Sequence, residues 1–401
     1  MSILNKSIIN SLFALTAIVA LSSCNKDFED ATAPSSTPNN GQTIDAIIKS
    51  GANYNILQAA IAKAGLDSVL NISNNSLTLF APDDDAFALS GITPATIEAL
   101  PQAEVQQILS YHIIPNSLPS ALIPNVFPNT QMPTLLQLDP TNPFFTASVF
   151  PWKTPTGQLY ANNIPVTTAD QLASNGVIHN VAAVLTPPSA LLAQIIYGDT
   201  SLTYLTAAIA RADSGQVGLN RIDSLLKYPF VNMTFLAPNN SAFQNILFEE
   251  IYGALLQEGV PASTAASEAG ALSASPNVFS TPELYSVLTA ATVRGILVYH
   301  ILAVNEGGSF QPLDRVFSVN FPTAPGSFVT TLVNSVYAAH PGIEAQATFT
   351  GPVVSSLQFT GLGTFPPGGT PYSGTPANTV KFDEIGVNGV VHVIDAVLLP
   401  Q

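Results

Sequence analysis

Charged side chains are scarce in this 401-residue chain. Only 9% of its residues are Asp, Glu, Lys or Arg, against roughly 25% in an average protein. The 11 Lys and Arg residues are outnumbered by 26 Asp and Glu residues, which gives a formal net charge of −15. Nucleic-acid binding requires clustered cations that neutralise phosphates. The composition therefore excludes nucleic acid as an expected partner, and polyanions in general should be repelled.

Cysteine is almost absent as well. Cys24 is the only one in the chain, so no disulfide can form within it. The sequence also has no G-x-S-x-G, HxH or HExxH motif. Nucleophilic catalysis and a histidine-rich zinc site therefore lack the sequence patterns on which they usually depend.

The first 23 residues have the pattern of a targeting segment. A lone cation, Lys6, precedes an apolar stretch at residues 8–21 that is too short to span a bilayer as an ordinary helix. The Leu-Ser-Ser-Cys sequence that ends at Cys24 resembles the lipobox of bacterial lipoproteins. The resemblance implies that residues 1–23 are a lipoprotein signal peptide and that Cys24 is lipidated, which would hold the protein on a membrane without spanning it. The alternative is a plain signal peptide with a chance cysteine.

A tether is expected at residues 24–42. Residues 25–30 (NKDFED) resemble the acidic sorting signals that send some Gram-negative lipoproteins to the outer face of the outer membrane, although any solvated tether could be acidic. Residues 31–42 are rich in Pro, Ser, Thr and Asn, which predicts a disordered linker. We therefore expect an outer-membrane lipoprotein of the cell envelope that is exposed at the cell surface.

The remaining chain repeats one plan. The sequence TLFAPDDDAF at residues 78–87 returns as TFLAPNNSAF at residues 234–243. In each copy an apolar run typical of a buried strand stops at an Ala-Pro pair, and residues that cap helices follow at once. We refer to this segment as the strand-to-helix junction, and its recurrence predicts two domains of the same fold.

Two further matches occur in the same order within the two predicted domains. VQQILSYHII at residues 105–114 matches VRGILVYHIL at residues 293–302, and each contains a Tyr-His pair. The closing sequence GVIHNVAAVLTP ends at Pro187, and its counterpart GVVHVIDAVLLP ends at Pro400, with seven of twelve positions identical. The predicted domains are therefore residues 43–187 and 189–401.

The second domain is the longer one and carries two predicted insertions. The first lies within residues 247–282, where LFEEIYGALLQEG is a helix candidate, and the second lies between residues 321 and 381. The first domain has its own Pro-rich excursion at residues 115–155. The Pro187-Pro188 linker is short and stiff, so the domains should lie against each other or keep a limited range of angles. Long loops on a rigid scaffold commonly carry binding sites.

The junction sequence, the Tyr-His pair and the closing sequence together resemble the fasciclin domain. The resemblance covers both copies with several motifs in the correct order. It implies an α+β fold, in which each domain is a β-wedge of short mixed strands with helices packed on it. It also implies a role in adhesion, since fasciclin domains occur in cell-surface and matrix adhesion proteins.

Asp83, Asp84 and Asp85 form the sharpest acidic cluster, and carboxylates are the ligands that hard cations prefer. The second copy replaces them with Asn-Asn-Ser, which keeps the ability to cap a helix and removes the charge. We therefore interpret the cluster as a helix cap. We expect no metal site here and no cofactor in the chain.

Four of the five histidines occupy matched positions in apolar runs, His112 with His300 and His179 with His392. A half-buried histidine bonded to the backbone is the expected role, with a metal or catalytic role as the alternative. The Tyr-His region of fasciclin domains is tied to receptor contact. The resemblance thus implies that the ligand-binding residues are Tyr111, His112, Tyr299 and His300.

Two Asp-Ser-apolar sequences, with Ser68 and Ser224 at their centres, resemble a bacterial O-glycosylation motif. A turn or helix cap is the simpler interpretation. The sequence leaves the choice open.

Aromatic residues crowd the end of the Pro-rich excursion and the segment that follows it: Phe144, Phe145, Phe150, Trp152 and Tyr160. They could form an exposed platform for sugars or protein partners, or they could cover the core as a satellite cluster. Candidate acids such as Glu249, Glu250 and Asp395 occur in one copy only, and nothing marks them as the pair that glycoside hydrolysis needs.

These observations lead to a non-enzymatic, surface-anchored adhesion or binding lipoprotein. Its expected partners are a cell-surface protein, matrix or polysaccharide, with the membrane reached through the N-terminal lipid. A glycan-processing enzyme or accessory subunit of the cell envelope is the alternative, and a purely structural envelope protein is a third possibility.

Overall fold

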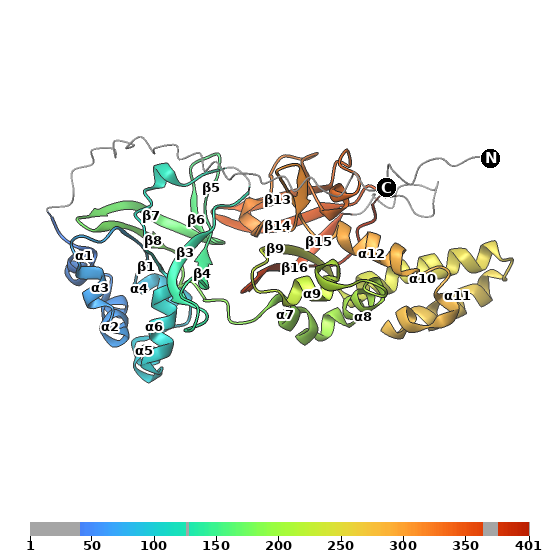
Figure 1. Ribbon diagram of the computed structural model, residues 1–401, viewed down its shortest axis with the longest axis horizontal. Coiled ribbons are helices and arrows are strands. Elements are labelled where there is room, and N and C mark those ends of the chain that lie inside the picture. Colours follow the sequence, from blue (N-terminus) through green and yellow to red (C-terminus); the bar gives the residue numbers. More distant parts are fainter. Residues whose placement is uncertain (1–40, 126–127, 364–375, 401) are drawn as a thin grey trace, which may run out of the picture. The chain divides into compact units, whose positions relative to one another are not determined.

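The computed structural model describes residues 41–125, 128–363 and 376–400 (Figure 1). The predicted signal peptide, the lipidation site Cys24 and nearly all of the predicted tether lie outside these residues. Within the described ranges, no helix is both long enough and apolar enough to cross a membrane.

The first copy contains six α-helices and eight strands in the described residues. Its helices are α1 (Ile44–Ser50), α2 (Asn55–Ala64), α3 (Asp67–Asn71), α4 (Asp84–Leu89), α5 (Pro94–Ala99) and α6 (Gln102–Tyr111). Its strands are β1 (Leu77–Pro82), β2 (Ile113–Ile114), β3 (Met132–Gln137), β4 (Thr146–Val149), β5 (Pro151–Lys153), β6 (Leu159–Ala161), β7 (Ile164–Ala173) and β8 (Gly176–Val181).

The second copy follows the same order. Its helices are α7 (Leu192–Gly198), α8 (Thr203–Ala212), α9 (Ile222–Lys227), α10 (Asn240–Gln257), α11 (Ala262–Ser273) and α12 (Ala290–Tyr299). Its strands are β9 (Met233–Pro238), β10 (Val304–Glu306), β11 (Ser309–Gln311), β12 (Phe328–Val329), β13 (Ile343–Thr350), β14 (Val353–Thr360), β15 (Ala377–Gly386) and β16 (Gly389–Ile394). The first copy also has the short 3-10 helix η2 (Ser120–Leu122). The second copy has η3 (Thr200–Leu202), η4 (Gly218–Asn220), η5 (Pro276–Ser280), η6 (Pro282–Leu284), η7 (Ser318–Asn320) and η8 (Leu332–Ser335).

In each copy the first strand of the sequence pairs in parallel with the last strand. β1 pairs in parallel with β8, and β9 pairs in parallel with β16. The other neighbours in the sheets are antiparallel, so both sheets are mixed. The strand orders are β2-β1-β8-β7-β6-β5 and β12-β13-β14-β15-β16-β9. The predicted α+β fold, with two copies of a wedge of mixed strands, is confirmed.

Helices cover one face of each sheet. In Figure 1 the helices α1–α6 gather below the strands of the first copy, and α7–α9 lie below the strands of the second. Leu57 and Ile61 of α2 belong to the same buried cluster as Leu79 of β1 and Ile178 of β8. These apolar side chains face each other because the period of the helix and the alternation of the strand place them on one side.

The strand-to-helix junction caps the helix that it begins. Pro82 ends β1, and the Asp83 carboxylate accepts a hydrogen bond of 2.9 Å from the Ala86 N–H. In the second copy the Asn239 amide oxygen accepts one of 2.8 Å from the Ala242 N–H. The predicted capping role is confirmed in both copies, and it needs an oxygen acceptor rather than a charge.

The next residue of the junction caps a different helix. The Asp84 carboxylate accepts a hydrogen bond of 2.9 Å from the Ile56 N–H at the start of α2. Asn240 accepts one of 3.1 Å from the Tyr204 N–H at the start of α8. The junction therefore fixes two helices at once, which explains why it recurs in both copies.

A buried asparagine, whose role was not predicted from the sequence, joins the closing strand to the first helices. The Asn175 amide oxygen accepts from the Ile44 N–H at 2.8 Å, and its amide nitrogen donates to the carbonyls of Leu70 and Ile72 at 2.8 and 3.1 Å. The partners of Asn388 in the second copy are the Leu192 N–H and the carbonyls of Leu226 and Tyr228. One buried side chain thus satisfies three backbone groups in each copy.

The two expected insertions and the excursion have secondary structure of their own. The helix expected at LFEEIYGALLQEG is confirmed as part of α10, which continues without a break from the junction, and the Ala/Ser-rich segment forms α11. The Pro-rich excursion contains a hairpin of β3 and β4. The second insertion contributes β12, β13 and β14, and its residues 364–375 lie outside the described part.

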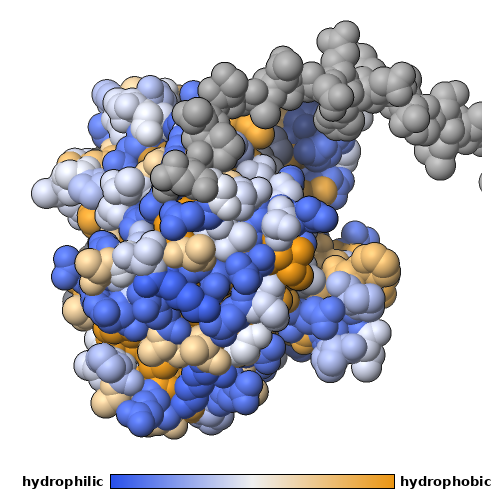
Figure 2. Space-filling model, turned by 90° about the vertical axis from the view of Figure 1, so that its left-hand side faces the viewer, coloured by the Kyte–Doolittle hydropathy of each residue, from blue (hydrophilic) through white to orange (hydrophobic). Residues whose placement is uncertain are grey.

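Figure 2 shows the distribution of hydrophilic and hydrophobic residues on one face of the molecule. On this side of the molecule, where α1, α2 and α5 lie, hydrophilic residues alternate with pale and scattered hydrophobic ones, and the hydrophobic areas stay small. Because only 9% of the residues are charged, neutral polar side chains must supply much of the surface polarity.

Candidate ligand-binding groove

The Tyr-His pairs lie in the core of each copy. Tyr111, His112, Tyr299 and His300 are all 0% exposed. The His112 Nδ1–H donates to the Ile108 carbonyl at 2.8 Å, and the Leu185 N–H donates to His112 Nε2 at 2.9 Å. The imidazole therefore carries its proton on Nδ1 and is neutral.

His300 repeats this geometry with Ile296 and Leu398, at 2.8 and 2.9 Å. Burial lowers the pKa of both His112 and His300 to about 4. Each ring ties the end of a helix to the closing sequence of its copy, which is the structural role expected for these histidines.

A partner would meet none of the four Tyr-His residues on the surface. The Tyr111 hydroxyl donates to the Ser148 carbonyl at 3.1 Å, and the Tyr299 hydroxyl donates to the Gly342 carbonyl at 2.8 Å. Their ligand-binding role stays a prediction.

The other matched histidines use the opposite ring nitrogen as donor. The His179 Nε2–H donates to the Leu118 carbonyl at 2.9 Å, and Nδ1 accepts from the Asp170 N–H at 3.2 Å. His392 makes the same contacts with Val316 and the Asp383 N–H. Burial lowers the pKa of His179. The described residues contain no group of three or more His, Cys, Asp or Glu side chains placed to hold a metal ion.

The crowded aromatic residues divide between core and surface. Phe150, Trp152 and Tyr160 are buried, and they form a cluster with Phe317, Val319 and Val390 of the second copy. For these three the satellite-core interpretation is confirmed, with the refinement that the cluster joins the two copies. Phe144 is 94% exposed.

Hydrogen bonds add to this apolar contact between the two copies. The Asn129 amide nitrogen donates to the Arg315 carbonyl and to the Asn320 amide oxygen, both at 2.7 Å. The Tyr160 hydroxyl donates to the Pro352 carbonyl at 2.7 Å. These contacts are largely shielded from water, and buried hydrogen bonds of this kind fix a geometry.

Two charged groups, Asp314 and Arg315, are also buried at the contact between the copies. The Arg315 guanidinium lies 4.8 Å from the centre of the Phe150 ring and donates to the Asn232 amide oxygen and the Val387 carbonyl. Burial lowers the pKa of Arg315 to about 10 and raises the pKa of Asp314 to about 6.

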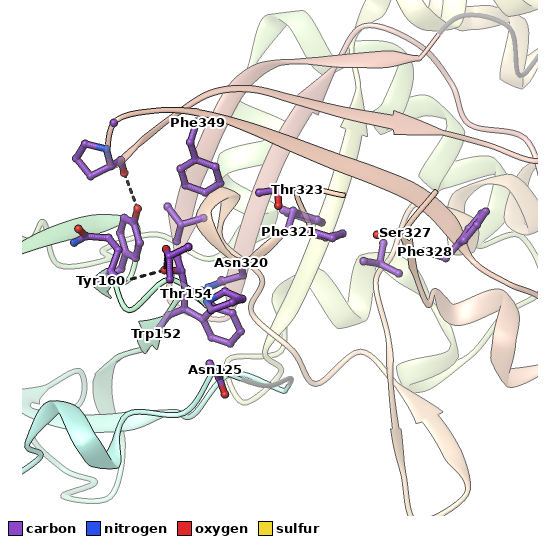
Figure 3. Close-up of a pocket in the computed structure, with 18 residues that line it drawn as sticks. Asn125, Trp152, Thr154, Tyr160, Asn320, Phe321, Thr323, Ser327, Phe328 and Phe349 are labelled. Atoms are coloured by element: carbon purple, nitrogen blue, oxygen red, sulfur yellow. Dashed lines mark hydrogen bonds between the residues drawn. The ribbon is translucent and has the colours of Figure 1, made fainter. Parts of the chain in front are cut away.

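A groove opens beside this cluster, between the two copies. Its cavity volume is about 870 Å³, within the range of roughly 300 to 1,000 Å³ that small-molecule sites occupy. In Figure 3, Trp152 and Tyr160 group together, Ser327 and Phe328 lie at the opposite end of the lining, and Phe321 lies between them. We refer to this feature as the inter-copy groove. Its first-copy lining is Asn125, Trp152, Thr154, Pro155, Thr156, Gln158 and Tyr160, and its second-copy lining is Val319, Asn320, Phe321, Pro322, Thr323, Ser327, Phe328, Val329, Phe349, Gly351 and Pro352.

The groove has an aromatic floor and a neutral polar rim. Trp152, Tyr160 and Phe321 are buried along the floor, whereas Phe328 is 43% exposed at the rim. Thr156 and other exposed residues complete the rim. No lining residue is charged. The site can therefore hold an uncharged ligand by surface contact and neutral hydrogen bonds.

The aromatic residues that the second copy contributes to the groove were not predicted from the sequence. Phe321 lies at the start of the expected second insertion, and Phe328 and Phe349 lie within it. Their aromatic character is visible in the sequence, but nothing in it shows that they face the first copy. The same applies to a second exposed aromatic surface, in which Phe145 and Phe230 have ring centres 5.0 Å apart.

The comparisons with known proteins identify the fold of the first copy. The sequence model described as Fasciclin domain matches residues 52–187. Protein sll1483 of Synechocystis sp. is 27% identical over 174 residues, which cover 42% of this chain and 87% of that protein. The transforming growth factor-beta-induced protein ig-h3 of Sus scrofa is 29% identical over 157 residues, which cover 38% of this chain and 20% of that protein.

Among solved structures, a FAS1 domain pair from the insect cell adhesion molecule Fasciclin I is similar. The match covers 86% of this chain and 95% of that chain, with 15% sequence identity and a TM-score of 0.31. Because this likeness is weak over the full length, the assignment depends on the family match and on the internal repeat.

Proposed function

The chain carries a fasciclin domain at residues 52–187 and repeats its fold in the second copy, and from this premise we propose a lipid-anchored adhesion protein of the cell envelope. Fasciclin domains are in general binding and adhesion modules rather than enzymes. The finer proposal is that this protein binds a cell-surface, matrix or polysaccharide ligand without turnover.

The observation that carries the proposal is the inter-copy groove. It is built by both copies, its lining is aromatic and neutral, and none of its lining side chains is an acid, a base or a thiol. Such a lining supports binding, whereas acid–base catalysis needs titratable groups within hydrogen-bond reach of the substrate.

The sequence supports the anchoring part of the proposal. Cys24 follows a lipobox-like sequence, and the tether from there to residue 42 could extend at most about 3.3 to 3.6 Å per residue. A lipidated Cys24 would hold the protein while the tether lets the groove reach a ligand some tens of ångströms from the membrane surface.

A groove-blocking variant tests the binding part. Thr323 is exposed at the rim, so Thr323→Trp should fill the groove without removing a core contact. We expect cells or beads that carry this variant to lose most of their adhesion to the host's own cell surface. The matched control is Thr264→Trp on the exposed side of α11, outside the groove lining, which should adhere as well as the parent. Full adhesion by Thr323→Trp would contradict the proposal.

Protease shaving of intact cells tests the location. The proposal predicts that external protease releases fragments of this chain while a periplasmic marker stays intact. If no fragment is released until the outer membrane is opened, the protein faces the periplasm and the adhesion proposal fails.

A further inference from the structure

We propose that the inter-copy groove binds a neutral carbohydrate chain. The inference rests on the proposed function, which makes the groove the binding site, and it adds the chemical class of the ligand. It follows from the charge of the lining, its hydrogen-bonding groups and the form of its edges.

The charge of the lining favours an uncharged ligand. None of the 18 lining residues is Asp, Glu, Lys, Arg or His. A charged ligand would lose hydration on entering the groove and gain no opposite charge in return. The net charge of −15 adds repulsion against acidic polymers.

The polar groups of the rim match sugar hydroxyls. No described residue hydrogen-bonds the hydroxyl group of Thr323 or of Ser327, so both can serve a ligand. Each such hydroxyl donates one hydrogen bond and accepts others, as a sugar hydroxyl does. On the first-copy side, the Gln158 amide nitrogen donates hydrogen bonds to the carbonyls of Leu159 and Val166, at 2.9 and 3.0 Å. Its amide oxygen therefore remains as an acceptor.

The rim on the first-copy side is held in place before a ligand arrives. The Thr154 N–H donates to the Gln158 carbonyl, and the Gly157 N–H donates to the Thr154 carbonyl, both at 2.9 Å. The hydroxyl groups of Thr154 and Thr156 are 2.9 Å apart and share a hydrogen bond. This closed turn reduces the ordering that binding would require.

The aromatic residues suit the apolar C–H faces of sugar rings. Phe328 projects from the edge strand β12 with 43% of its surface exposed, and Phe349 is half-buried on β13. Aromatic rings offer large apolar contact area at low conformational cost. In Figure 3 the aromatic residues are spread along the lining from Trp152 to Phe328 rather than gathered at one point, which suits an extended ligand.

The edges of the groove do not suit an added peptide strand. β5 is three residues long and begins with Pro151, and its Lys153 N–H already donates to the Pro124 carbonyl at 3.2 Å. β12 is two residues long. Strand addition needs a longer row of free backbone groups, so a neutral glycan fits the groove better than an extended peptide.

The single tryptophan provides a direct test. Trp152 is the only one in the chain and belongs both to the groove lining and to the apolar cluster beside it, so its fluorescence reports on this region of the protein. We would titrate the lipid-free mature protein with neutral hexasaccharides of glucose, mannose, galactose and xylose and with an acidic oligogalacturonate of the same length. At least one neutral hexasaccharide should give a saturable change that 0.2 M salt leaves unaltered, and the acidic one should give none.

Matched phenylalanine variants locate the effect. Phe328→Ala removes the exposed ring from the rim and should weaken binding of the neutral sugar about tenfold. Phe144→Ala removes a ring of even greater exposure outside the groove lining and should change affinity less than twofold. Near-ultraviolet circular dichroism of both variants checks that they remain folded.

Three results would overturn the inference: equal or tighter binding of the acidic hexasaccharide, a Phe144→Ala effect as large as that of Phe328→Ala, or no response to any neutral sugar. These results are distinguishable from failure of the proposed function. Adhesion that is lost in Thr323→Trp but accompanies no neutral-sugar binding would keep the groove as the site and exclude the carbohydrate class. Adhesion that persists in Thr323→Trp would reject the groove itself.

Discussion

The paired histidines act through their neutral form. In His112 and His300 one ring nitrogen donates to a carbonyl and the other accepts from a backbone N–H. A second proton would remove the acceptor in a fully buried site, which is why burial lowers the pKa of each to about 4.

The acid dependence of stability follows from these values. Unfolded histidine takes up its proton below about pH 6.5, whereas the folded protein resists protonation of these two until about pH 4. Their contribution is therefore full above pH 6.5 and falls as the pH drops to 4, by about 3 kcal/mol for each histidine. We expect NMR titration to show no midpoint for either ring above pH 5. A midpoint near 6.5 would contradict the structural role.

The contribution of Asp314 to stability has the opposite dependence on pH. Burial raises its pKa from 3.8 to about 6, so its contribution to stability is full below pH 3.8 and is lost as the pH rises through 6. Two histidines oppose this one carboxyl group, so the free energy of unfolding should still fall on acidification between pH 6.5 and 4.

Asn175 should be more important for stability than its place in a turn suggests. Asn175→Ala leaves the Ile44 N–H and two carbonyls without their buried partners, which should cost about 3 kcal/mol. The control, Asn142→Ala, removes one hydrogen bond to the Phe144 N–H on an exposed turn and should cost at most about 1 kcal/mol. Urea unfolding of both variants measures the difference, and equal costs would contradict the anchoring role.

At the scale of elements, the closing strand of each copy begins with a glycine that lies too close to its parallel partner strand to carry a side chain. Gly176 has a φ of +151°, and a Cβ built there would lie 2.0 Å from the Leu77 carbonyl oxygen. Gly389 makes the same approach to the Met233 carbonyl oxygen. Each strand pair can therefore form only with glycine at that position.

Alanine should destabilise the protein at the glycine of the strand contact and stabilise it at a glycine inside a helix. Gly176→Ala must separate β1 from β8 and should cost more than about 3 kcal/mol. Gly270→Ala lies in α11 with no atom near the added methyl group and should stabilise the protein by about 0.5 to 1 kcal/mol. Thermal unfolding of the two variants gives the comparison. A tolerated Gly176→Ala would show that the parallel pair is not tightly packed there.

The elements differ in how well the sequence predicts them. The junction and the closing strand could be recognised because their apolar runs, prolines and caps act locally and occur twice. The buried Asn175 could have been suspected because an Asn directly precedes the first glycine of each closing sequence, but its partners at Ile44 and Leu70 are remote in the chain. The groove could not be predicted, because it depends on which faces of the two copies meet.

The whole molecule joins its copies through a small apolar cluster and a few buried hydrogen bonds. Asn129 contributes three of these bonds, to Asp314, Arg315 and Asn320. The groove lies beside this contact, so its width depends on the two copies holding a fixed arrangement.

Loss of the Asn129 side chain should uncouple the copies. The parent should unfold in a single calorimetric transition, since each copy stabilises the other through the shared cluster. Asn129→Ala leaves the Asn320 amide oxygen with one partner fewer and should separate the transition into two. The control Asn305→Ala, on an exposed hairpin of the second copy, should keep one transition. Two transitions already present in the parent would contradict the coupling.

The central claim is that both copies together form one binding site. Hydrogen–deuterium exchange of the mature protein, with and without the neutral polysaccharide fraction of the host's own envelope, tests it most directly. We predict added protection at residues 151–158 of the first copy and at residues 319–329 of the second, with the same dependence on polysaccharide concentration. Protection confined to one copy, or centred on Phe144 and Phe230 instead, would contradict the claim.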